Sequence, residues 1–391
     1  MCFVGNCRSN LSFSFNGNIS FIVFKLILIM NLASISENRD IEKRIAITPE
    51  IAKKYISLGF NLTLPNNYGT YLGFTDEEYK NLGVNFSDNE KEIIKNSEIV
   101  IQLGLPLEEK LSFFNENQTL IGSLNAFVNK EKLENLKSKK INCFSLELLP
   151  RITRAQSMDI LSSQANLAGY KAVVEAFQVY ERAIPMMMTA ARTIPAAKVL
   201  VVGAGVAGLQ AIATAKRMGA VVFATDVRMA SKEQVESLGG KFLTVEGSEN
   251  LETEGGYAKE ASIEFKKKQE ELLSETLKKI DIIICTALIP GREAPKIIKE
   301  EMFKNLQSGS VIYDLAAVQG GNTVYTEVNK IVEKDGVKIL GETNILNKLP
   351  VSASNLYAKN LFNFISNLYD KENKKLNINL EDEIIEKTLI K

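Results

Sequence analysis

A glycine-rich segment between two apolar runs constrains the fold of this chain more than any other feature. Gly203, Gly205 and Gly208 directly follow the apolar run 199–202 and open an alanine-rich stretch, after which a second apolar run leads to Asp226. A G-x-G-x-x-G pattern alone is a weak signal, but a strand, this turn and a helix in direct succession are typical of a dinucleotide-binding unit. The sequence therefore predicts a nucleotide site at this segment.

Each of these residues has a distinct expected role. Gly203 permits the tight turn, Gly205 lets a pyrophosphate approach the backbone, and Gly208 lets helix and strand pack closely. The helix N-terminus adds free amides and a partial positive charge. The Asp226 carboxylate can accept hydrogen bonds from ribose hydroxyls and would repel a 2′-phosphate; Arg228 leaves NADP open, but we favour NAD over NADP and over a purely structural turn.

Apolar runs that alternate with helical stretches extend over the rest of the chain and predict an α/β fold. Predicted strands lie at 61–64, 99–103, 119–122, 141–145, 241–245, 280–285, 310–314 and 337–340. Predicted helices lie at 49–58, 130–136, 163–181 and 352–369, with a hairpin at 186–195. A short strand is expected directly before Thr48, which we predict to cap a helix that has Pro49 at its first position. We expect the charged tail after Asp370 to be loosely attached.

Composition restricts the partners and the chemistry. Lys+Arg and Asp+Glu both number 47, so no net positive field favours nucleic acid or an acidic membrane as a partner. Lys43 and Arg44 could meet an anionic ligand, but charges beside a strand are usually solvated. The cysteines are far apart, and we predict neither a metal site nor a disulfide framework. The chain has no histidine, so any proton transfer must use other groups.

The first 29 residues differ in composition from the rest and lead into the apolar run 22–30. This run is interrupted by Lys25, is too short to span a bilayer and precedes no A-x-A-like cleavage site. We interpret residues 1–29 as a non-native or disordered extension before a start at Met30. The alternatives are a weak export or anchor signal and an ordered N-terminal addition.

Two arginines, an amide, a carboxylate and hydroxyls gather within a dozen residues directly before the long predicted helix that links the domains. One interpretation is a solvated loop followed by a helix that Asp159 or Ser162 caps. The other is a ligand site. Arg151 and Arg154 suit a pyrophosphate or a carboxylate, whereas Gln156, with Asp159 and Ser162, can hold a carboxamide.

Two segments after the glycine turn are further candidates. The polar stretch 246–273 is either a surface loop leading into a solvated helix or a lid in which glycines such as Gly256 act as hinges and Tyr257 closes over the nucleotide. Ala287 and Leu288 directly follow a predicted strand, where a doubly wound sheet binds its ligand.

Five segments in this order resemble the soluble NAD(H)-binding component of proton-translocating nicotinamide nucleotide transhydrogenase. They are residues 150–163, 195–208, 232–239, 255–260 and 314–322. The resemblance implies two Rossmann-like doubly wound lobes with an NAD cleft between them. The first lobe would comprise residues 30–162 and 350–391, and the second would comprise residues 163–349. The chain ends before any membrane-spanning helix, which resembles the split alpha subunit of some bacteria.

The resemblance also implies an activity and partners. Hydride would pass directly between NAD(H) on this chain and NADP(H) on the beta subunit, while proton movement through membrane subunits drives NADPH formation. The expected partners are the NADP(H)-binding domain of the beta subunit, a separate membrane part of the alpha subunit, and a second copy bound through the second lobe and its Met186 region. The protein would lie on the cytoplasmic face of the membrane.

The resemblance places site residues in three groups. The catalytic loop at the nicotinamide comprises Arg151, Gln156, Asp159 and Ser162, and Val206, Asp226 and Arg228 surround the adenosine. The mobile lid contains Gly256 and Tyr257. The complete cofactor-binding set that we predict is Arg151, Ile152, Thr153, Arg154, Gly203, Gly205, Val206, Gly208, Asp226, Val227, Arg228, Gly256, Tyr257, Ala287 and Leu288.

Two rival functions remain. Alanine dehydrogenase is similar in fold and glycine motif, but its chemistry needs groups that bind a carboxylate and protonate a carbonyl oxygen. That family uses a lysine and a histidine, and this chain has no histidine and carries Val318 where an aspartate is expected. A non-catalytic NAD sensor is the second rival; the polar loop from Arg151 to Ser162 favours chemistry over sensing.

Overall fold

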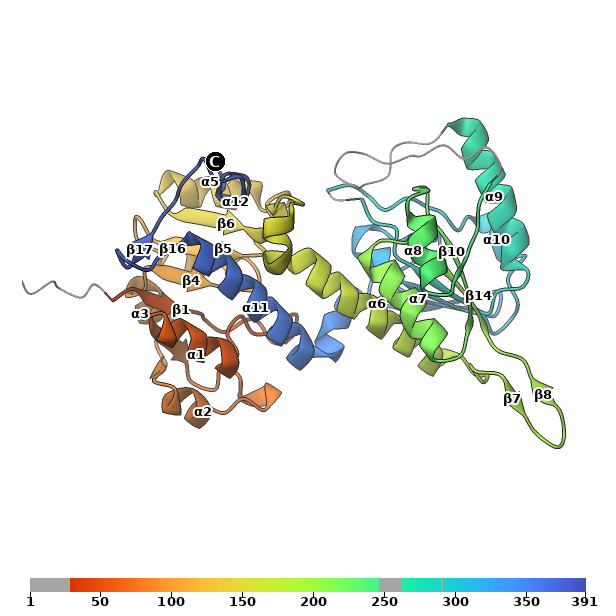
Figure 1. Cartoon of the computed structure of the whole chain (residues 1–391), viewed down its shortest axis with the longest axis horizontal. Helices are drawn as coiled ribbons and strands as arrows, with labels where there is room; N and C mark the ends of the chain where they lie inside the picture. The colour runs from red at the N-terminus through yellow and green to blue at the C-terminus, as the bar shows by residue number, and fades with distance from the viewer. Residues whose placement is uncertain (1–28, 246–261, 290) are drawn as a thin grey trace, which may run out of the picture.

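The computed structural model describes residues 29–245, 262–289 and 291–391, and it has two lobes joined by long helices (Figure 1). The extension predicted at 1–29, apart from its last residue, lies outside the described residues. The same holds for segment 246–261, which contains Gly256 and Tyr257.

The first lobe contains a six-stranded, fully parallel sheet in the order β3-β2-β1-β4-β5-β6. Its strands are β1 (Asn31–Ala33), β2 (Asn61–Pro65), β3 (Asn85–Ser87), β4 (Ile99–Ile101), β5 (Thr119–Gly122) and β6 (Asn142–Ser145). Its helices are α1 (Pro49–Ser57), α2 (Asp76–Asn81), α3 (Glu90–Lys95), α4 (Glu108–Leu111) and α5 (Lys130–Ser138). Alternate strand residues face opposite sides, so Ile99 and Ile101 join the core under α1, whereas Val100 joins the core under α3 and α5.

The second lobe contains a seven-stranded sheet in the order β11-β10-β9-β12-β13-β15-β14, with only β14 antiparallel to its neighbour. Its strands are β9 (Lys198–Val202), β10 (Val221–Thr225), β11 (Lys241–Phe242), β12 (Ile282–Cys285), β13 (Val311–Asp314), β14 (Ile331–Lys334) and β15 (Val337–Leu340). The covering helices include α7 (Val206–Arg217), α8 (Ser231–Ser237), α9 (Ile263–Leu277) and α10 (Glu300–Phe303). The uninterrupted apolar run of β12 is buried on both faces, as is usual for a central parallel strand.

Both sheets therefore have the Rossmann strand order 3-2-1-4-5-6, with β14 added at the edge of the second. Two helices connect the lobes: α6 (Ile160–Val179) leads out of the first lobe, and α11 (Pro350–Leu368) returns to it (Figure 1). The predicted hairpin is present as β7 (Met187–Met188) and β8 (Thr193–Ile194), and it projects from the second lobe (Figure 1).

Two local predictions are wrong. Residues before Thr48 form no strand; instead, the buried backbone N–H of Ile45 donates to Ser354 Oγ (2.9 Å), and that of Ala46 donates to the Tyr68 hydroxyl (3.0 Å). Side chains thus satisfy the polar backbone that a sheet ladder would otherwise satisfy. Thr48 does occupy the N-cap position of α1, but its side chain makes no cap hydrogen bond.

The C-terminal tail is also not loose. It ends in the helix α12 (Glu383–Thr388), whose Ile384 and Ile385 are buried in the core of the first lobe. Ile390 donates its backbone N–H to Cys143 O in β6 (2.9 Å). A few apolar side chains are enough to anchor a segment whose composition alone suggests a solvated tail.

Candidate functional site

The glycine turn lies at the carboxyl end of β9, next to β12, where the strand order reverses. In an open α/β sheet this crevice is the usual ligand site. Gly203 has a φ of 93°, which favours glycine. A Cβ at Gly208 would lie 1.9 Å from Gly203 O, so only glycine lets α7 pack this closely against the strand. In contrast, no heavy atom lies within 4 Å of the position that a Cβ would take at Gly205.

The space at Gly205 lies in front of a helix N-terminus. Gly205 is the N-cap of α7, and no side chain caps the helix. The amides and partial positive charge of the first turn suit a phosphate group. Val206, the first helical residue, remains 41% exposed, as does Leu288 on the neighbouring connection. The residues at this turn therefore fit the pyrophosphate of a dinucleotide.

Asp226 follows β10 and faces the same turn. Its side chain accepts from the backbone N–H of Ala204 (2.7 Å) and forms an ion pair with Arg228 (2.8 Å). Burial raises the pKa of Asp226, but the Arg228 guanidinium and the backbone N–H groups of Arg228 and Ala204 outweigh it and hold the pKa below its usual value. Asp226 is thus an ionised acceptor at neutral pH, and it is already bonded before any ribose binds.

A buried polar network holds the segment that follows β12 and contains Ala287. Asn322, which is fully buried, accepts from the backbone N–H of Ala287 (3.0 Å) and donates to Ala287 O (2.8 Å) and to Pro295 O (2.9 Å). Asp314 in turn accepts from the backbone N–H of Asn322 (2.7 Å). Burial raises the pKa of Asp314, and hydrogen bonds from its surroundings oppose that rise.

Sequence reasoning assigned no role to Asn322 or Asp314. The available signal was an amide placed directly after the consecutive glycines Gly320 and Gly321, both of which have positive φ. Such a turn is typical of a close backbone approach.

The polar loop predicted as a ligand site forms the 3₁₀ segment η3 (Thr153–Met158) and the start of α6. Asp159 is the N-cap of α6: its carboxylate accepts from the backbone N–H of Ser162 (2.9 Å) and from the Ser162 hydroxyl. The predicted cap is therefore confirmed. Gln156 is exposed on this loop.

The two arginines of this loop are both exposed, and Ile152 and Thr153 lie between them. The Arg154 guanidinium pairs with Asp382 near the C-terminus, with one bond of 2.9 Å. This pairing raises the pKa of Arg154 and lowers that of Asp382. Arg154 thus has a structural partner within the first lobe. Arg44, whose charge we expected to be solvated, is instead largely buried and held by Glu42 and by Gln164 (2.8 Å).

The position of the polar loop relative to the glycine turn follows from the course of helix α6. At the middle of this helix, Gly169 packs against the first turn of α7: a Cβ at Gly169 would lie 2.0 Å from Ala207 O. At its far end, the Tyr180 hydroxyl donates to Asp281 (2.9 Å), and Asp281 also accepts from the backbone N–H of Lys198 at the start of β9 (2.8 Å). The helix therefore runs from the carboxyl edge of the second sheet to its amino edge.

The loop consequently lies beyond the carboxyl edge, on the side of the glycine turn. Asp159 precedes Gly169 by ten residues, which is about 15 Å along the helix axis at 1.5 Å per residue. The structure thus places the polar loop and the glycine turn, the two segments predicted to bind the nucleotide, beyond the same edge of the second sheet.

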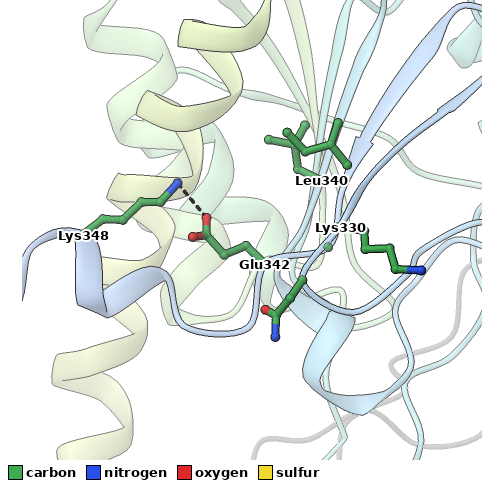
Figure 2. Close-up of a pocket in the computed structure, with 7 residues that line it drawn as sticks. Lys330, Leu340, Glu342 and Lys348 are labelled. Carbon is green, nitrogen blue, oxygen red and sulfur yellow. Dashed lines mark ion pairs between the residues drawn. The ribbon is translucent and has the colours of Figure 1, made fainter. Parts of the chain in front are cut away.

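An open pocket elsewhere in the second lobe was not predicted. It has a volume of about 200 Å³ and is lined by Asn329, Lys330, Ile331, Leu340, Gly341, Glu342 and Lys348 (Figure 2). Both of its lysines are paired: Lys348 with Glu342 (2.9 Å) and Glu175 (2.6 Å), and Lys330 with Glu327 (2.6 Å). Lys348, which lies just before α11, connects to α6 through Glu175 and to the segment after β15 through Glu342, which is a structural role.

Neither a metal site nor a membrane span occurs in the portion of the chain that the structure describes. Among those residues, no group of three or more His, Cys, Asp or Glu side chains is arranged to hold a metal ion. In the same residues, no helix combines the length and apolar character needed to cross a bilayer.

The sequence matches two domain descriptions of one family. Residues 34–168 match "Alanine dehydrogenase/PNT, N-terminal domain", and residues 172–391 match "Alanine dehydrogenase/PNT, C-terminal domain". The chain belongs to the alanine dehydrogenase/PNT family.

Members of the alanine dehydrogenase/PNT family with different activities are similar to this chain to different degrees. The first part of NAD(P) transhydrogenase subunit alpha of Rhodospirillum rubrum is 48% identical over 368 residues, which cover 92% of this chain and 96% of that protein. The crystal structure of transhydrogenase from Sinorhizobium meliloti has a TM-score of 0.83 at 42% identity, covering 92% and 97% of the two chains. Alanine dehydrogenase of Methanococcus maripaludis is 27% identical over 317 residues, or 79% of each chain.

These similarities confirm the resemblance and the predicted fold class of two Rossmann-like lobes. They also make the chain a member of an oxidoreductase family in the alanine dehydrogenase/PNT group, with transhydrogenase subunits as its more similar relatives.

Proposed function

We propose that this chain is the NAD(H)-binding subunit of a proton-translocating transhydrogenase. The observation that carries the proposal is the open glycine turn at Gly205, beside the ionised Asp226, in a chain similar over most of its length to the first part of a transhydrogenase subunit alpha. In this proposal the lobes comprise residues 30–162 with 350–391, and residues 163–349.

The nucleotide would lie along the carboxyl edge of the second sheet. Its pyrophosphate would bind at the first turn of α7, and its adenosine near Val206 and the segment Asp226–Arg228, including Val227. The nicotinamide would extend past Ala287 and Leu288 toward the polar loop. There, Gln156 and the hydroxyl of Ser162 would hold the carboxamide, and Arg151 would add positive charge.

The reaction is the transfer of one hydride from the C4 of NADH to the C4 of NADP⁺ on a beta subunit, which yields NAD⁺ and NADPH. No proton donor or acceptor is required at the reacting carbons, which agrees with a chain that has no histidine. The protein's task is to place one nicotinamide ring at near-contact distance from the other. Proton movement would occur in separate membrane subunits, on whose cytoplasmic face this chain would lie.

A second copy of the chain would bind through the second lobe. The hairpin supports this aspect of the proposal, because Met186, Met187 and Met188 are 62%, 41% and 79% exposed on a segment that projects from the lobe (Figure 1). Exposed methionines are typical of adaptable protein interfaces.

The test is reconstitution. The purified chain should bind NADH more tightly than NADPH and should catalyse transhydrogenation only when mixed with the NADP(H)-binding domain of a beta subunit. Within this mixture, Gln156→Asn should slow hydride transfer more than it weakens NADH binding. Oxidation of NADH by the chain alone in the presence of pyruvate and ammonia would instead establish the alanine dehydrogenase alternative.

A further inference from the structure

One face of α11 carries amide side chains that form hydrogen bonds with the polar loop and with its partner Asp382. Asn360, Asn363 and Asn367 are three and four residues apart and therefore share a face of the helix. The burial of apolar residues such as Leu361 and Phe364 fixes α11 in the core of the first lobe. The asparagines thus project from a rigid element.

Asn360 makes the most extensive contact with the loop. Its side-chain nitrogen donates to Ser157 O (2.9 Å), and its side-chain oxygen accepts from the Ser163 hydroxyl (2.7 Å). Ser157 precedes the N-cap residue Asp159, and Ser163 follows it, so one carboxamide holds both sides of the cap. Asn360 is only 8% exposed, which shields these bonds from competing water.

The neighbouring asparagines extend the attachment. Asn363 donates a second hydrogen bond to Ser157 O (2.8 Å). Asn367 donates to Asp382 (3.2 Å), which also holds Arg154 of the loop. The Gln156 and Ser157 side chains of the loop are exposed, so they do not anchor it in the core. Ala155 and Met158 of the loop are buried in the core of the first lobe, and the asparagines of α11 add the polar attachments that fix the backbone around Ser157.

We propose that Asn360 is a positioning residue for hydride transfer: through Ser157 and Ser163, it fixes Gln156, Asp159 and Ser162 relative to the nicotinamide. This inference rests on the proposed function. Asn360 does not touch the nucleotide. Its effect should fall on the geometry of the reacting ring, because displacement by about 1 Å can slow a reaction of this kind about 100-fold.

The experiment uses the full chain mixed with the NADP(H)-binding domain of a beta subunit. Asn360→Ala should lower the hydride-transfer rate at saturating NADH about 10- to 100-fold, while the Kd for NADH stays within about threefold, because no residue of α11 belongs to the proposed pyrophosphate and adenosine contacts. Asn360→Asp keeps the acceptor for Ser163 but places a carboxylate oxygen against Ser157 O, where two acceptors repel each other, so its rate should fall at least as far as that of Asn360→Ala. Asn355→Ala changes an exposed asparagine of the same helix and is the matched control.

If Asn360→Ala does not fold, Ser163→Ala removes one of the two attachments with a smaller perturbation and should shift the rate in the same direction. An unchanged rate in the folded variants, or equal losses in rate and in NADH affinity, would overturn the inference while leaving the proposed function intact. Absence of transfer in the wild-type mixture would overturn both.

Discussion

The two lobes have the same strand order but differ at the point where that order reverses. In the second lobe, the space next to β9 and β12 is kept open by Gly205. In the first lobe, side chains fill the corresponding space next to β1 and β4: the Gln102 side chain accepts from the Ser34 hydroxyl (2.8 Å), and Ser34 accepts from the Tyr68 hydroxyl (2.8 Å). Glu37 accepts from the Gln102 amide (3.0 Å) and closes this network.

The difference begins with the length of the connection after the first strand of each sheet. Only residues 203–205 separate β9 from α7, so the helix N-terminus lies directly at the strand end. Residues 34–48 separate β1 from α1, and this longer segment folds back with Ile45 and Ile47 buried. A shared topology thus creates the same crevice in both lobes, but the connecting residues leave it open only in the second.

The largest effect is expected from a methyl group in the tightest region of the glycine turn. Gly208→Ala would place Cβ 1.9 Å from Gly203 O and force α7 away from β9. We expect the free energy of unfolding to fall by about 1–3 kcal/mol and NADH affinity to fall more than about 100-fold. Denaturant titration and NADH fluorescence measure the two. The control is Gly104→Ala in the first lobe, where no heavy atom lies within 4 Å; similar losses there would contradict the comparison.

The second prediction concerns Gly205, where an added methyl group should weaken nucleotide binding without destabilising the fold. Gly205→Ala meets no atom within 4 Å, and the residue has an ordinary φ of −76°, so the midpoint of thermal unfolding should not change. The methyl group would occupy the approach of the pyrophosphate, and NADH should bind about 10- to 100-fold more weakly. Wild-type affinity in this variant would show that the nucleotide does not lie at this turn.

A smaller effect is expected from the carboxylate of Asp226, which we propose to favour NADH over NADPH. Asp226→Asn should weaken NADH binding about tenfold, because hydrogen bonds to a charged acceptor are worth about 1.5–3 kcal/mol. It should also reduce the preference for NADH over NADPH, since the repulsion of a 2′-phosphate is lost. Because hydrogen bonding lowers the pKa of Asp226, the carboxylate contributes stability at neutral pH that is lost only as pH falls toward that pKa. Isothermal titration with both nucleotides tests this; an unchanged ratio would place the ribose elsewhere.

The smallest effect on nucleotide binding is expected from the filled space in the first lobe. Burial raises the pKa of Glu37 from 4.5 to about 7, with Glu42 adding to the rise and Arg44 and the backbone N–H groups of Leu103 and Gly104 opposing it. The folded state then binds the proton more tightly than the unfolded state, so this contribution to stability is complete below about pH 4.5 and is lost as pH rises through about 7.

Glu37→Gln should therefore flatten the pH dependence of unfolding between these values, by at most about 1.4 kcal/mol per pH unit. Urea titrations at several pH values measure the slope. Affinity for NADH should stay at the wild-type value, and a loss of affinity would mean that the filled space next to β1 and β4 takes part in binding the nucleotide.

Local sequence patterns were sufficient to predict much of the fold and part of the candidate site. The apolar runs located β4, β9 and β12 because buried parallel strands need continuous apolar residues. The cap at Asp159 was also predictable, since its partner Ser162 lies only three residues away. In contrast, two elements were not predicted. β1 has only three residues, too few for a periodic pattern, and the buried residues of α12 lie among charged residues that suggest a solvated tail.

Partners that are distant in sequence could not be predicted. Arg154 and Asp382 are separated by 228 residues, and Ser157 and Asn360 by 203, and neither pair is marked by spacing or composition. Arg44 is similar: its charge suggested solvent or a ligand, and only the packing of α6 and α11 brought Gln164 beside it and buried it.

The sequence by itself determined the position of the open glycine turn where we propose that a dinucleotide binds, because glycine conformation and helix polarity are local properties of Gly203, Gly205 and Gly208. It also excluded histidine chemistry outright. Only the tertiary structure decided that the first lobe fills its equivalent space, and that α11 holds the polar loop on the same side of the sheet as the glycine turn. Those outcomes depend on hydrogen bonds between residues far apart in the chain, whose pairing is set by packing of the lobes and not by local propensity.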